Sequence, residues 1–159
     1  MKKLHLCLIT LFVLFAAQAQ TITEKELLGE WQVGNVVFDG NYYDVQKDSL
    51  SISGDYAKEL RKSVPDATDE DVKKEAYSFV SSLQTAKMVV KPGHRFEAYK
   101  KNRLTGEGTY TLPQNAALPI VFKGKTETFE FYLKDNKLTA TVIGRGSPKD
   151  ITVTFIKTK

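Results

Sequence analysis

The stretch LLGEWQVGNV (residues 27–36) contains the only tryptophan of the chain, Trp31, two residues after Gly29. The segment before it, TEKE (residues 23–26), is a capping-box pattern, in which the Thr and Glu side chains each satisfy a free backbone N–H at the start of a helix. Gly29 is a natural helix stop. We therefore expect one helical turn that ends just before Trp31, followed by a strand over residues 30–38, which are rich in Val and aromatic side chains.

From Ala86 onward the sequence alternates between apolar and polar residues in short runs, which Gly, Pro and Asn turn signals separate. In one late run Phe129, Phe131 and Leu133 share a face of the expected strand. Together with the Trp31 strand, these runs predict about eight strands joined mostly by tight hairpins. An open sheet leaves exposed edges, and a closed barrel leaves none. We therefore expect an all-β fold, an up-and-down antiparallel β-barrel of about eight strands; a two-sheet sandwich is the alternative.

A helical pattern interrupts the strands after the first one, and we expect a helical insertion over residues 55–84. Thr68 and Asp71 predict its main helix start, and the apolar residues that follow recur on one helical face. We expect this face to cover one opening of the barrel as a lid; packing on the outer wall is the alternative. The candidate lid residues are Val72, Ala76, Phe79 and Leu83. Residues 42–54 are ambiguous, although SLSISG could form a short strand.

Residues 1–19 have the pattern of a secretory signal peptide, with a positive start, an apolar core over residues 4–15, and Ala17-Gln18-Ala19 as a cleavage pattern. The apolar run is short for a membrane span. The later strands are also short, and Lys and Thr recur on faces that would meet lipid in a membrane barrel. We expect residues 20–159 to form one exported domain, periplasmic or extracellular, that does not span a membrane.

Charge and rare residues exclude several kinds of site. The chain has 23 Lys and Arg against 19 Asp and Glu, with both signs interspersed, so we expect no nucleic-acid partner. Cys7 is the only cysteine and lies in the expected leader, so no disulfide is expected. His94 is the only histidine outside the leader, which leaves too few ligands for an ordinary zinc site, and no nucleophile elbow accompanies it. We expect no catalytic residues, no metal and no cofactor.

The helical turn, Gly29-Glu30-Trp31 and the first strand of a β meander resemble the Gly-x-Trp motif of lipocalins. The chain as a whole resembles the secreted lipocalin-like domains of Bacteroidetes, on GEGTYTL (residues 106–112) and TFEFYLKDNKLTAT (residues 128–141). The resemblance implies that Trp31 closes the bottom of the barrel, that Gly29 lets the preceding turn approach closely, and that a basic side chain stacks over the indole. Lys157 has the matching position, where the family usually has arginine.

The same resemblance implies a secreted binding protein, not an enzyme, that holds a small hydrophobic molecule inside the barrel. The candidate interior residues that would bind it are Phe96, Tyr110, Phe122, Phe129 and Phe131. These rings either pack against one another as a filled core or leave a cavity for a guest. With a filled barrel, the alternative function is a protein–protein interaction or inhibitor module of the cell envelope, which would use its loops or its helix face.

Overall fold

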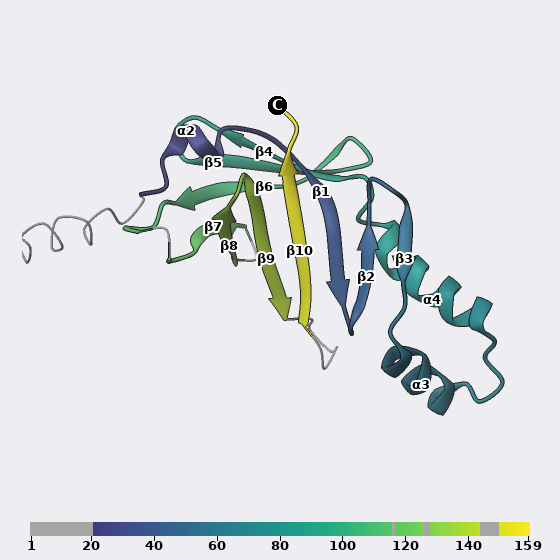
Figure 1. Ribbon diagram of the computed structural model, residues 1–159. Coiled ribbons are helices and arrows are strands. Elements are labelled where there is room, and N and C mark those ends of the chain that lie inside the picture. The colour runs from purple at the N-terminus through teal and green to yellow at the C-terminus, as the bar shows by residue number, and fades with distance from the viewer. Residues whose placement is uncertain (1–20, 116, 126–127, 144–149) are drawn as a thin grey trace, which may run out of the picture.

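The computed structural model describes residues 21–115, 117–125, 128–143 and 150–159, so the expected signal peptide lies outside it (Figure 1). The helices are α2 (Glu24–Leu27), α3 (Gly54–Ser63) and α4 (Asp69–Ser81). The strands up to the middle of the chain are β1 (Gly29–Phe38), β2 (Asn41–Asp44), β3 (Ser49–Ser51), β4 (Ala86–Lys91) and β5 (Arg95–Lys100). The later strands are β6 (Arg103–Thr111), β7 (Ile120–Gly124), β8 (Thr128–Lys134), β9 (Lys137–Ile143) and β10 (Asp150–Lys157).

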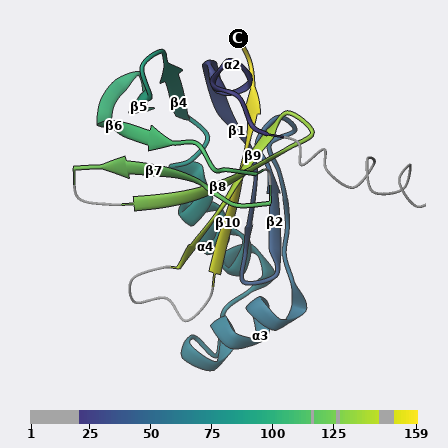
Figure 2. The ribbon, with the colours of Figure 1, turned by 90° about the vertical axis from the view of Figure 1, so that its left-hand side faces the viewer.

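The barrel consists of β1 and the strands that follow the helices. From β4 to β10 each strand pairs antiparallel with the next one in the chain. β1 closes the ring, because one of its edges pairs with β4 over residues 29–32 and the other pairs with β10 over residues 31–38. The result is a closed antiparallel up-and-down barrel of eight strands, which confirms the predicted fold class (Figure 2).

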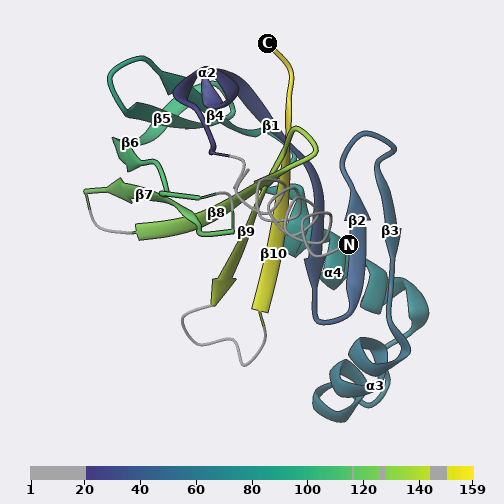
Figure 3. The same ribbon diagram turned by 60° about the vertical axis from the view of Figure 1, so that its left-hand side comes forward.

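β1 also pairs with β2, a strand outside the barrel. Beyond residue 34, the edge of β1 that had paired with β4 pairs with β2 instead, and β3 follows β2 (Figure 3). A bulge between Val33 and Asn35 shifts the register against β10 at the same place. Trp31 and Val33 are buried before the bulge, and Val36 and Phe38 after it, so the extra residue keeps the apolar side chains on one face. The β2–β3 hairpin therefore lies between β1 and the predicted helical insertion of residues 55–84, in a segment whose sequence was ambiguous.

The core has two parts that share one inner surface. The first fills the barrel around Trp31 and Phe122, and the second lies around Val36 and Tyr43, between β1, β2 and α4. Phe155 of β10 packs against both parts. The inner face of the barrel therefore continues past its end along β1 and β10.

α4 covers this continuation of the inner face. Thr68 caps the helix, since its hydroxyl accepts the Asp71 N–H at 3.2 Å and the Asp71 carboxylate accepts the Thr68 N–H at 3.0 Å, as the sequence predicted. Of the candidate lid residues, Val72 and Ala76 are buried, and Leu83 packs against the second part of the core. Phe79 is 45% exposed and lies against Phe38, with ring centroids 4.8 Å apart.

Candidate functional site

Trp31 lies at the closed end of the barrel, beneath α2. Its side chain is fully buried, and its indole N–H donates to the Leu27 carbonyl oxygen at 2.8 Å. Lys157 lies opposite Trp31 in the β1–β10 register, with Nζ 5.5 Å from the ring centroid. The same ammonium donates to the Glu26 carbonyl oxygen at 2.9 Å. The indole and the lysine thus both hold the end of α2 against the barrel.

Gly29 permits a close approach of two chain segments at this end. Its φ is +129°, and a Cβ built there would lie 2.0 Å from the carbonyl oxygen of Lys159. That oxygen accepts the Glu30 N–H at 3.1 Å, and the Thr158 N–H donates to the Glu30 carbonyl oxygen at 2.8 Å. The segment that needs the missing side chain is therefore the one that follows β10, whereas the resemblance implied the turn before Gly29.

A carboxylate of α2 forms hydrogen bonds with the β4–β5 turn and with β6. Glu24 accepts the backbone N–H of His94 at 3.2 Å and the hydroxyl of Tyr110 at 3.1 Å. These two hydrogen bonds, that of His94 first, lower the pKa of Glu24 below its ordinary value. Burial, and then the bond to Glu24, raise the pKa of Tyr110. The His94 side chain is exposed in the β4–β5 turn, and its backbone N–H makes the hydrogen bond to Glu24.

The candidate interior rings pack mainly against one another. Phe122 is fully buried, and its ring centroid lies 5.1 Å from that of Phe96, 5.3 Å from that of Tyr110 and 4.9 Å from that of Phe131. Phe129 is only partly buried. The sequence predicted that these rings lie in the interior, and the structure shows that they pack in one core cluster with Trp31 and with Leu27 of α2.

A hollow of about 610 Å³ opens at the other end, between the β5–β6 and β7–β8 hairpins. We call it the inner hollow. Phe96, Ala98, Leu104, Gly106 and Phe129 give it apolar walls, and Glu107 and Lys125 lie at its rim. Ala98 and Gly106 are opposite each other in the β5–β6 register, so the space arises where two neighbouring inward positions have small side chains. Its volume is typical of small-molecule sites.

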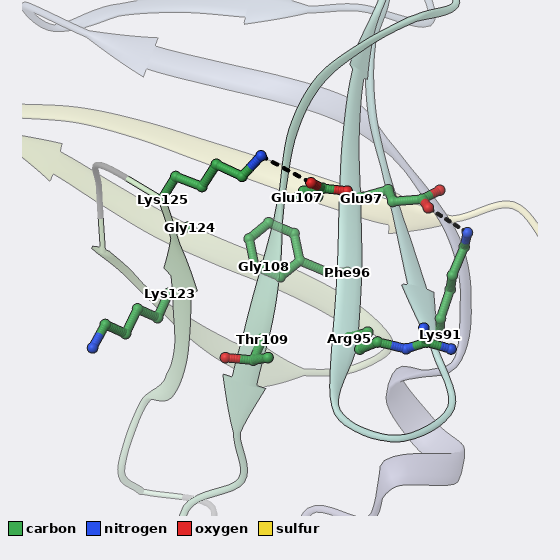
Figure 4. A pocket seen from close by; sticks show the side chains of 10 residues that line it. All are labelled: Lys91, Arg95, Phe96, Glu97, Glu107, Gly108, Thr109, Lys123, Gly124 and Lys125. Carbon is green, nitrogen blue, oxygen red and sulfur yellow. Dashed lines mark hydrogen bonds and ion pairs between the residues drawn. The ribbon is translucent and has the colours of Figure 1, made fainter.

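A second hollow, of about 550 Å³, lies on the outer face of β4 to β7 (Figure 4). We call it the outer hollow. Two ion pairs cross it, Lys91–Glu97 at 2.5 Å and Lys125–Glu107 at 3.0 Å. The hydrogen bond from Lys91, and then that from Tyr99, lower the pKa of Glu97.

The two hollows meet at Phe96, Glu107, Gly124 and Lys125, which line both. β6 pairs with β7 only over residues 108–111, so residues 103–107 of β6 have β5 as their ladder partner and no partner from β7. We call this interruption of the pairing the β6–β7 notch. The Lys125–Glu107 ion pair joins its two sides.

Glycine makes the wall thin beside the notch. Gly108 and Gly124 are opposite each other, and a Cβ on Gly108 would lie 2.1 Å from the Lys123 carbonyl oxygen and 2.8 Å from the Phe96 ring. The Phe96 ring is therefore visible from the outer hollow, behind Gly108 (Figure 4). The sequence analysis did not identify Ala98, Leu104 and Gly106 as site residues, because small or isolated apolar side chains do not by themselves indicate a binding site. The glycines of GEGTYTL were the available indication of space inside the barrel.

Among the residues that the structure describes, no three His, Cys, Asp or Glu side chains gather as metal ligands would. Within the same residues, no helix has the length and apolar character needed to cross a bilayer.

Comparison with known proteins does not assign the chain to a family. No protein-family profile matches the chain, and no curated protein sequence is significantly similar to it.

Proposed function

We propose that the protein is an exported, lipocalin-like carrier that binds a small hydrophobic molecule in the inner hollow without catalysing a reaction. The inner hollow is the observation that carries this proposal, since Phe96, Ala98 and Phe129 line it with apolar surface inside a closed barrel. The arrangement of Gly29, Trp31 and Lys157 at the closed end supports the resemblance to lipocalins.

Burial of apolar surface would supply the affinity. A guest gains about 25 cal/mol for each Å² of apolar surface that it removes from water. The rings around Phe122 pack against one another farther inside, so we expect the guest to lie at the open end. We therefore expect one small molecule per barrel, held between the β5–β6 and β7–β8 hairpins.

The leader pattern in residues 1–19 supports a periplasmic or extracellular location. A carrier in that location would hold an apolar molecule in water between membranes or outside the cell. Comparing the N-terminal residue of the protein from its host with Gln20 would test the expected cleavage after Ala19.

Titration of the full chain with the neutral fluorophore N-phenyl-1-naphthylamine tests the binding function. We expect saturable binding at one site, weakened at least about tenfold by Ala98→Phe, whose ring would fill the inner hollow. Leu104→Asp is a second variant that should also weaken binding, because it puts a charge in the apolar lining of the inner hollow. Leu104 is half exposed, so the folded protein tolerates this charge. Thr111→Phe, on the exposed face of β6, is the matched control and should bind as the unmodified chain does. Equal binding by all variants would show that the fluorophore lies elsewhere.

A protein–protein interaction or inhibitor module is the second candidate. Two observations favour it: the rings around Phe122 fill much of the barrel, and Val37 and Tyr42 form an exposed pair across β1 and β2. This function predicts no fluorophore binding and a stoichiometric protein partner in a pull-down from the cell envelope or culture fluid. Loss of that partner in Val37→Ser and Tyr42→Ser variants would assign the surface.

A further inference from the structure

The outer hollow has more basic than acidic side chains. Glu97 and Glu107 each have a lysine partner, Lys91 and Lys125. Arg95 and Lys123 also line the hollow, and neither forms an ion pair or a hydrogen bond through its side chain with any residue in the described part of the chain. Among the described residues that line the outer hollow, there is therefore more positive than negative charge.

Arg95 and Lys123 lie on either side of a hydroxyl group. Arg95 of β5 is opposite Thr109 of β6, and Thr109 is opposite Lys123 of β7, so the three residues form one row across the strands. Directly opposite residues have Cβ atoms about 4.5–5.5 Å apart. In Figure 4 the Arg95 and Lys123 side chains extend away from each other and leave Thr109 between them. The row offers N–H and O–H donors, which suit an anion.

Lys125 links this positive surface to the inner hollow. It lines both hollows at the β6–β7 notch, and its side chain is 79% exposed. Its partner Glu107 is 52% exposed, so Lys125 can leave that ion pair for another anion without stranding a buried charge. Lys123 lies two residues before it and lines the same outer hollow.

We propose that the ligand is an acidic amphiphile of the aliphatic carboxylic acid class. Its alkyl chain occupies the inner hollow against Phe96 and Phe129, and its carboxylate emerges at the β6–β7 notch. There Lys125 and Lys123 bind the carboxylate from the outer hollow, and Arg95 adds to the positive field. This inference rests on the proposed carrier function, because the inner hollow supplies the apolar half of the site.

Calorimetric titration with decanoate and with 1-decanol, above pH 7 and at low salt, tests the inference. The two probes have the same chain length and differ in the charge of the head group. We expect the unmodified full chain to bind decanoate about fivefold more tightly than decanol, and added salt to weaken decanoate binding alone. The double variant Lys123→Ala/Lys125→Ala should bind the two probes equally. The control Lys58→Ala/Lys73→Ala removes the same charge from the exposed faces of α3 and α4 and should keep the preference.

Each result separates the two proposals. Equal binding of decanoate and decanol by the unmodified chain, or a preference that persists in the Lys123→Ala/Lys125→Ala variant, would overturn the anionic head-group site and leave the carrier function intact. If neither probe binds, the inference fails, and the fluorophore titration alone then decides whether the carrier function stands. A preference that only the outer-hollow variant loses would establish the acidic amphiphile as the ligand class.

Discussion

The ammonium group of Lys157 lies 5.5 Å from the ring centroid of Trp31, and the two residues are opposite each other across β1 and β10. The same ammonium binds the Glu26 carbonyl oxygen. One side chain therefore joins the last strand, the first strand and α2 at the point where the barrel closes.

Replacing Lys157 with Met removes the charge and keeps an apolar stem over the indole. We expect the free energy of unfolding to fall by about 1 kcal/mol, because both the cation–π contact and the bond to the Glu26 carbonyl are lost. Urea unfolding followed by Trp31 fluorescence measures this. Lys157→Arg should retain the stability, and a Met variant as stable as the unmodified chain would show that the ammonium contributes nothing.

Gly29→Ala places a methyl group where the Lys159 carbonyl approaches, at a φ of +129°. We expect a loss of about 2 kcal/mol or more in the free energy of unfolding. Gly54→Ala is the matched control, since a Cβ there meets nothing within 4 Å and the residue begins α3. The control should be neutral or slightly stabilising. Equal stabilities of the two variants in urea would mean that the close approach is not required.

The folded state lowers the pKa of Glu24 below its ordinary value of 4.5, chiefly through the hydrogen bond from the His94 backbone. A carboxyl with a lowered folded pKa adds stability that is fully present above its unfolded pKa and is lost as pH falls through the folded value. We expect stability to decline as pH falls below 4.5 and expect Glu24→Gln to flatten that decline. Tyr110→Phe should flatten it partly, because it removes one of the donors. Urea midpoints measured over this range that fall equally in all three chains would contradict the assignment.

Phe122 lies at the centre of the interior rings, in contact with Phe96, Tyr110 and Phe131. We expect Phe122→Ala to lower the free energy of unfolding by about 3–5 kcal/mol, since the ring is fully buried and its neighbours cannot fill the space. Phe79→Ala makes the same chemical change at a side chain that is 45% exposed and should have a much smaller effect. Similar losses in the two variants, measured by chemical denaturation, would argue against a filled interior.

Much of the barrel was predictable because its signals are local. The capping boxes at Thr23 and Thr68 act over three residues, and the alternation that put Phe122 and Phe131 inside follows from the pleat of a single strand. The β2–β3 hairpin was less predictable, because it depends on β1 exchanging β4 for β2 along one edge. That exchange is a relation between distant segments, and no pattern within residues 41–51 encodes it.

The candidate site likewise has features that follow from local sequence and features that depend on contacts between distant segments. The sequence by itself determined the eight strands of the barrel, their inward faces, the aromatic interior and the place of Trp31 at the start of the first strand, because each follows from side-chain type and spacing along a few neighbouring residues. Only the tertiary structure decided that Ala98 and Gly106 face each other, that β6 and β7 stop pairing at Gly108, and that Lys125 reaches both hollows. The physical reason is that a cavity is defined by strand register and missing volume, and both depend on which distant residues the closed barrel brings together.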